Sequence, residues 1–105
     1  MKPNRNDSDA YKKRTEDALF SAVDSLGDIH ECRNFFKDLC TPAELQALVD
    51  RWRIAELLRD DLSYRRINEL TGVSVTTIGR VARCLVDGYG GYQAALDRSG
   101  GLNAS

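Results

Sequence analysis

A chain of 105 residues with 42% hydrophobic and 30% charged residues has the composition of one globular domain. No apolar run reaches the roughly 18 residues that a membrane span needs, and no signal peptide is evident, so we expect a cytoplasmic protein without membrane contact. The formal net charge is −1, yet residues 62–85 hold four arginines and one glutamate. This local excess predicts a basic face on a slightly acidic chain.

Residues that carry metal or catalytic chemistry are few and scattered. Cys32, Cys40 and Cys84 are odd in number and lack CxxC spacing, which argues against both a disulfide framework and a zinc motif. The single histidine, His30, has no nucleophile and orienting group at a recognisable spacing. We therefore expect no metal site, no catalytic residue and no enzymatic activity.

The first predicted helix follows a polar segment, residues 1–7, that we expect to be disordered. Ser8 is placed to cap this helix, which should run over residues 9–26, and Gly27 is placed to end it. Its apolar residues share one stripe: Tyr11, Ala18, Leu19, Ala22, Val23 and Leu26.

Two further helices begin with clear start signals. Asp28 with Glu31 three residues later resembles a capping box, and Ile29, Cys32, Phe35, Phe36 and Leu39 follow at helical spacing. The motif "TPAE" at residues 41–44 combines an N-cap threonine, a first-turn proline and a glutamate, and predicts a long helix to about Arg59. That helix is apolar on more than one face, so we expect its own domain or another subunit to bury it on several sides.

The rest of the chain also reads as helical. Ser63 is placed to cap a helix of about eight residues, and a turn over 72–74 precedes a helix over 75–86. A short helix over 92–98 follows three glycines, and residues 99–105 should form a flexible tail. No alternating strand pattern is present, so the predicted fold class is all-α, with one helical domain over residues 8–98.

The two helices between residues 63 and 86 have the form of a helix-turn-helix. Gly72 stands at the end of the first, where a left-handed backbone costs other residues about 1–2 kcal/mol. Ser74 is placed to cap the second. The apolar residues expected between the helices are Ile67, Leu70, Val73, Ile78 and Val81.

The second helix of this motif divides into two faces. Ile78, Val81, Ala82 and Leu85 follow core spacing, whereas Thr76, Gly79, Arg80 and Arg83 share an outer face without any acid. Such a face can enter a major groove and donate to bases or phosphates, although a solvated surface is the alternative interpretation. Arg65 and Arg66 stand in the first turn of the preceding helix, where the macrodipole disfavours cations, which suggests an external anion.

The segment "FFKDLCTPAELQALVDRWRIAELLRDDLSYRRINELTGVSVTTIGRVARCL" resembles the Trp repressor superfamily, most closely its YerC/YecD group. The resemblance covers roughly residues 16–98. It implies a six-helix fold that forms an intertwined homodimer, with two helix-turn-helix units that bind DNA half-sites. By position, Arg65, Val75, Thr76, Thr77 and Arg80 resemble the residues of that family that contact DNA. Together with Arg66, Ser74, Gly79 and Arg83, they form the predicted DNA-binding set.

The effector site of that family transfers poorly to this chain. Arg80 matches one of the two arginines that hold the carboxylate of tryptophan, and Arg51 matches the other if "RWRI" is aligned by its arginines. Counting back from "LLRDDLS" instead places Asp50 there, and an aspartate would repel a carboxylate. We therefore expect no cofactor and do not expect tryptophan; another small co-effector, or none, stays open.

The leading functional hypothesis is a homodimeric, sequence-specific DNA-binding regulator, and more specifically a repressor that occupies its operator. The alternative is a helix-turn-helix adaptor that binds a protein and not specific DNA. The two differ in one measurable property, which is saturable binding to a defined DNA sequence.

Overall fold

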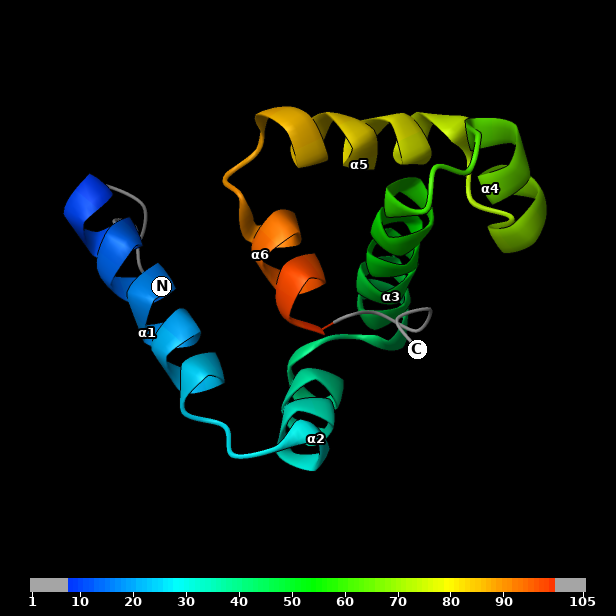
Figure 1. Ribbon diagram of the computed structural model, residues 1–105. Coiled ribbons are helices and arrows are strands. Elements are labelled where there is room, and N and C mark those ends of the chain that lie inside the picture. The colour runs from blue at the N-terminus through cyan, green and yellow to red at the C-terminus, as the bar shows by residue number, and fades with distance from the viewer. Residues whose placement is uncertain (1–7, 100–105) are drawn as a thin grey trace. The chain divides into compact units, whose positions relative to one another are not determined.

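The computed structural model describes residues 8–99, which form six α-helices and no strand (Figure 1). The helices are α1 (Asp9–Asp24), α2 (Ile29–Leu39), α3 (Pro42–Arg59), α4 (Tyr64–Thr71), α5 (Val75–Asp87) and α6 (Gly91–Ser99). The predicted all-α class is therefore confirmed. The expected disordered segment, residues 1–7, and most of the expected tail, residues 100–105, lie outside the described residues. Ser99, expected in that tail, is the last residue of α6.

The chain divides into two compact units, the first ending at Thr41 and the second beginning at Pro42. The first unit holds α1 and α2, and the second holds α3 to α6. Among the described helices, none is long and apolar enough to cross a membrane.

In the first unit, side chains cap both helices as the sequence predicts. The Ser8 hydroxyl accepts from the amide of Tyr11 at 2.9 Å, and the Asp28 carboxylate accepts from the amide of Glu31 at 2.9 Å. No residue of α1 or α2 is buried. These helices therefore form from local signals, and the apolar residues of their stripes are exposed or half-buried.

Gly27 has a different role from the expected one. Helix α1 ends at Asp24, before Gly27, and its last turn is closed by the amide of Ser25. The amide of Gly27 donates to the carboxylate of Glu31 at 2.7 Å, so the glycine belongs to the start of α2. The prediction that Gly27 ends the first helix is wrong, because the amide of Gly27 donates to the Glu31 side chain of the next helix and not to a carbonyl of α1.

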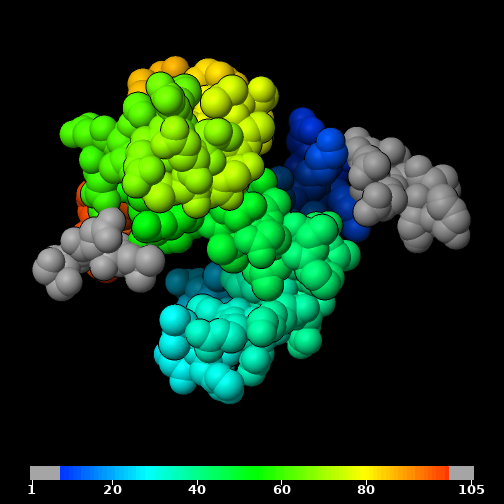
Figure 2. All heavy atoms as spheres, turned by 90° about the vertical axis from the view of Figure 1, so that its right-hand side faces the viewer, coloured from blue at the N-terminus to red at the C-terminus, as the bar shows by residue number. Residues whose placement is uncertain are grey.

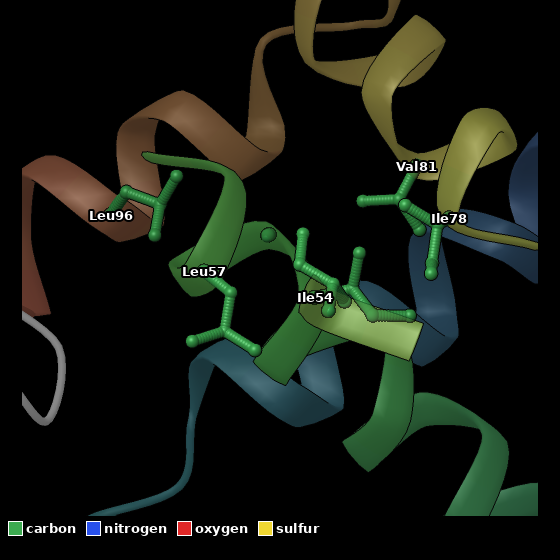
Figure 3. Close-up of a cluster of buried hydrophobic side chains, with 7 residues drawn as sticks. Ile54, Leu57, Ile78, Val81 and Leu96 are labelled. Carbon is green, nitrogen blue, oxygen red and sulfur yellow. The ribbon is translucent and has the colours of Figure 1, made fainter. Parts of the chain in front are cut away.

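The second unit is built around one small core. Helix α5 lies across one end of α3, with α4 before it and α6 after it (Figure 1). The buried side chains come from all four helices: Ile54, Ala55 and Leu57 of α3, Ile67 of α4, Ile78 and Val81 of α5, and Leu96 of α6. Figure 3 shows the labelled members of this cluster, drawn from α3, α5 and α6. This packing holds α5 against α3.

Two polar contacts support the same arrangement. Arg59 of α3 donates from its guanidinium to the backbone carbonyl of Leu96 in α6 at 3.1 Å. Glu56 is only 3% exposed, and Arg53 donates to its carboxylate at 3.2 Å. A buried carboxylate is stable only when it is paired or hydrogen-bonded, and Arg53 supplies one such partner.

The predicted interior of the helix-turn-helix is mostly confirmed. Ile67, Ile78 and Val81 are buried, and Val73 packs against them. Leu70, in contrast, is 50% exposed, so its predicted place between the two helices is wrong. It lies at the C-terminal end of α4, where it lines a hollow together with residues of α3.

Helix α3 is buried over only part of its length. Its buried residues cluster between Ile54 and Leu57, whereas Leu48 and Val49 in its first half are exposed. Burial within one chain therefore accounts for only some of the apolar residues of this helix.

Candidate nucleic-acid interface

The turn between α4 and α5 has the backbone that the sequence predicts. Gly72 ends α4 with φ 74° and ψ 1°, the left-handed conformation in which a glycine has no steric cost. Ser63 and Ser74 cap the two helices, accepting from the amides of Arg66 at 3.1 Å and Thr77 at 3.2 Å. Two short helices are thereby joined by three residues at a defined angle, which is the geometry of a helix-turn-helix.

Two side chains that were not predicted to take part in the turn hold it closed. Asn68 donates from its amide to the carbonyl of Val73 at 2.8 Å. The Thr71 hydroxyl donates to the carbonyl of Ile67 at 2.8 Å and accepts from the amide of Val73 at 3.1 Å. The signal was present, since Asn and Thr next to a turn glycine commonly bond to nearby backbone groups.

The outer face of α5 is accessible in the structure. Thr76, Arg80 and Arg83 are exposed, and Gly79 is half-buried between them. Figure 2 shows α4 and the start of α5 as one continuous surface. The predicted division into a core face and an outer face therefore exists, because Ile78 and Val81 point into the core while the polar set points away.

The first turn of α5 is accessible but partly engaged. Val75 is 55% exposed. The Ser74 hydroxyl donates to the Thr77 hydroxyl at 3.2 Å while it accepts from the Thr77 amide. These two side chains therefore serve the helix cap, and their ability to bind an external group is reduced.

Arg80 and Arg83 are free cations within the described part of the chain. No salt bridge joins either guanidinium to a carboxylate among residues 8–99. Exposed arginines without an internal partner keep all their donors available for phosphate oxygens or guanine edges.

Arg65 and Arg66 are placed differently. Both guanidinium groups contact the carboxylate of Glu69, at 3.3 Å and 3.4 Å. This pairing was not predicted from the sequence, although the i,i+4 and i,i+3 spacing signals it. The anion expected beside these two arginines is therefore supplied within the chain, by the carboxylate of Glu69. Both pairs are exposed, and such pairs contribute about 0–1 kcal/mol, so they can yield to a phosphate.

Gly79 is not explained by the packing of this chain. A glycine inside a helix costs about 1 kcal/mol relative to alanine. A Cβ built at this position would lie 3.7 Å from the Arg83 guanidinium and 3.9 Å from the Tyr64 ring, which are ordinary contact distances. The fold has room for alanine here.

An open hollow of about 700 Å³ is lined by residues of α3, α5 and α6. Trp52 and Tyr92 stack in its wall with ring centroids 6.5 Å apart, and Arg80 and Arg83 stand at its edge. Arg51, the other predicted effector residue, is half-buried and does not line it. Asp50 lines a separate hollow of about 320 Å³. The structure thus brings Arg80, and not Arg51, to the larger hollow.

The three cysteines are free thiols. Across residues 8–99, no three His, Cys, Asp or Glu side chains gather closely enough to hold a metal ion.

Comparison with known proteins places these features in one family. The family model described as Trp repressor protein matches residues 14–100. The uncharacterized protein YerC of Bacillus subtilis strain 168 is 44% identical over 90 residues, which cover 86% of each chain. The crystal structure of a TrpR-like protein from Eubacterium eligens ATCC 27750 has a TM-score of 0.75 and 38% identity, and it covers 94% of this chain and 97% of its own. A candidate Trp repressor from Staphylococcus aureus has a TM-score of 0.76 and 39% identity, over 81% and 85% of the two chains.

Proposed function

This chain belongs to the Trp repressor family as a YerC-type protein, and we propose that it is a transcriptional regulator that reads operator half-sites with α5. One observation carries the proposal most directly. The outer face of α5 presents Arg80 and Arg83 without an ion-pair partner in the described chain, on a helix-turn-helix whose turn is set by Gly72. Asp87 lies at the C-terminal end of the same face, which leaves two arginines against one acid, and a face with a net positive charge suits a helix in a major groove.

The other predicted contacts surround this face. Arg65 and Arg66 lie in the first turn of α4, where they can exchange Glu69 for phosphate oxygens. Thr76 and Val75 lie in the first turn of α5, the part of a recognition helix that approaches base edges. Ser74 and Thr77 mainly hold the start of α5 in place.

The proposal includes a homodimer. No residue of α1 or α2 is buried within one chain, and Ile29 is 73% exposed. Leu48 and Val49 leave the first half of α3 uncovered as well. Exposed apolar stripes on consecutive helices favour burial against a second copy, and two helix-turn-helix units would then bind half-sites about one helical turn of DNA apart.

Selection of DNA from a random pool by the purified protein tests the proposal. We expect a palindromic consensus whose half-sites are about 10–10.5 base pairs apart, and an affinity that falls as salt rises. An Arg80→Ala, Arg83→Ala double variant, which should fold because both side chains are exposed, is the matched control and should enrich no sequence. Absence of enrichment by the natural protein at low salt would count against DNA reading.

We propose repression over activation because a regulator that only occupies its operator needs no additional contact surface. A reporter placed downstream of the selected operator distinguishes the two: expression should fall when the protein is present and recover with the double variant. A rise in expression would contradict repression while leaving DNA binding intact.

A further inference from the structure

The glycines of the second unit differ in whether the backbone or the packing requires a residue without a side chain. Gly72 has φ 74°, so the backbone itself requires a glycine there. At Gly88 a Cβ would collide with the backbone carbonyl of Cys84. Gly79 has neither constraint, since it lies inside a regular helix and a Cβ there would meet only ordinary contacts. Neither the backbone nor the packing of the described chain therefore requires glycine at position 79.

A methyl group fits at the position of the missing Cβ of Gly79. The missing Cβ would lie 3.7 Å from a guanidinium nitrogen of Arg83 on one side and 3.9 Å from a ring carbon of Tyr64 on the other. Tyr64 is the first residue of α4 and is 44% exposed, so its ring forms one wall of this notch at the surface. A methyl group from another molecule would occupy the same position as the absent Cβ.

The floor and one wall of the notch suit an apolar group. Gly79 is the fifth residue of α5, so its amide belongs to the hydrogen-bonded ladder of the helix and is not among the free first-turn donors. The floor of the notch is therefore backbone carbon, one wall is an aromatic ring, and the other is the Arg83 guanidinium, whose donors can bind an acceptor beside the notch. The major groove offers one apolar group, the 5-methyl of thymine.

We propose that the notch formed by Gly79, Tyr64 and Arg83 receives the 5-methyl group of a thymine in the operator half-site. Gly79 and Tyr64 are then specificity-determining residues, because the first leaves the space open and the second encloses it. Arg83 borders the same space and can bind an acceptor next to that thymine. The inference rests on the proposed function, since it requires α5 to lie in the major groove.

The test uses the full chain and the operator obtained by selection. Each thymine of one half-site is replaced in turn by deoxyuridine, which lacks only the 5-methyl group. We expect one position at which the natural protein loses about fourfold in affinity, the effect of burying one methyl group. Equal affinity for thymine and deoxyuridine at every position would overturn the inference.

Gly79→Ala supplies the second arm, because it fills the notch with the chain's own methyl group. It should raise the melting temperature by a few degrees, since alanine favours the helix, and weaken operator binding at least tenfold. It should also bind the deoxyuridine and thymine operators equally. Gly91→Ala is the control, because its Cβ would meet nothing within 4 Å, and it should retain the natural preference.

Tyr64→Ala keeps the test decisive if Gly79→Ala does not fold. Removal of the ring opens one wall, so the preference for thymine over deoxyuridine should fall to less than twofold. A Gly79→Ala variant that binds the operator as well as the natural protein would overturn the inference. If the natural protein selects no operator at all, it is the proposed function that fails, and the two failures are thereby distinguished.

Discussion

The side-chain amide of Asn68 donates to the backbone carbonyl of Val73 at 2.8 Å, and this bond spans the turn between α4 and α5. The turn sets the angle between α4 and α5. Its hydrogen bonds therefore help to position the residues of α5 that are proposed to contact DNA. Asn68 itself is exposed and takes no part in the core. Its contribution can therefore be measured without creating a cavity.

Asn68→Ala should lower the free energy of unfolding by about 1 kcal/mol, the usual net value of one neutral hydrogen bond. Chemical denaturation checks the value. Asn34→Ala in α2 is the control, because its side chain makes only a long, exposed contact of 3.4 Å with His30 in the same helix, and it should change stability by less than about 0.5 kcal/mol. Equal effects of the two substitutions would contradict a structural role for the bond across the turn.

Gly72→Ala should cost about 1–2 kcal/mol, because φ 74° is unfavourable for a residue with a Cβ. Gly72→Asn should cost less, since asparagine tolerates the left-handed region. Thermal melting of both variants beside Gly91→Ala, which has an ordinary φ, gives the comparison. The diagnostic result is a lower melting temperature for Gly72→Ala than for Gly72→Asn. The reverse order would refute the backbone explanation.

Glu69→Gln should increase affinity for the operator by up to about fivefold at low salt. The substitution releases Arg65 and Arg66 from their exposed pairs, each worth about 0–1 kcal/mol, and removes a negative charge beside the DNA. Fluorescence anisotropy with labelled operator measures the change. Asp17→Asn breaks a comparable exposed pair with Lys13 in α1 and should leave affinity unchanged.

Arg80→Ala should weaken operator binding by about 1–3 kcal/mol if its guanidinium is bidentate to a guanine, with relaxed preference at one base pair. Arg83→Ala should lower affinity more evenly across sequences and reduce the salt slope by about one if it contacts a phosphate. Titrations at several salt concentrations separate the two roles. Arg33→Ala, an exposed arginine of α2, is the control.

Leu19→Glu should dissociate the proposed homodimer. Leu19 lies on the apolar stripe of α1 and is exposed within one chain, so a charge there would be buried only when two copies associate. Sedimentation equilibrium should give a dimer for the natural chain and a monomer for this variant. Ser21→Glu, away from the stripe on the same helix, should remain dimeric. A monomeric natural chain would refute the homodimer.

The sequence alone was sufficient to predict six helices and most of their ends. Ser8, Asp28, Ser63 and Ser74 cap helices as expected, and Gly72 has the expected left-handed backbone. These features depend on residues within one turn of each other, so a linear pattern contains the information. The role of Gly27 was predicted wrongly because its position suits both the end of α1 and the start of α2. Only the structure shows that its amide bonds to Glu31 of α2.

The candidate site was predictable as a face but not as a set of contacts. The spacing of Thr76, Gly79, Arg80 and Arg83 placed them together on α5, and the structure confirms that arrangement. Glu69 as the partner of both α4 arginines, and Tyr64 beside Gly79, were not foreseen. The first was readable from helix spacing, whereas the second joins two helices across the turn.

By itself, the sequence determined the helices, their caps, the turn glycine and the family to which the chain belongs, because each depends on short segments of chain. Only the tertiary structure decided which apolar residues are buried, leaving Leu70 at the surface and placing Ile54 beside Ile78 and Val81. It also showed that position 79 has room for a methyl group. These properties depend on how α3, α4, α5 and α6 pack, and packing joins residues whose separation in sequence carries no periodic signal.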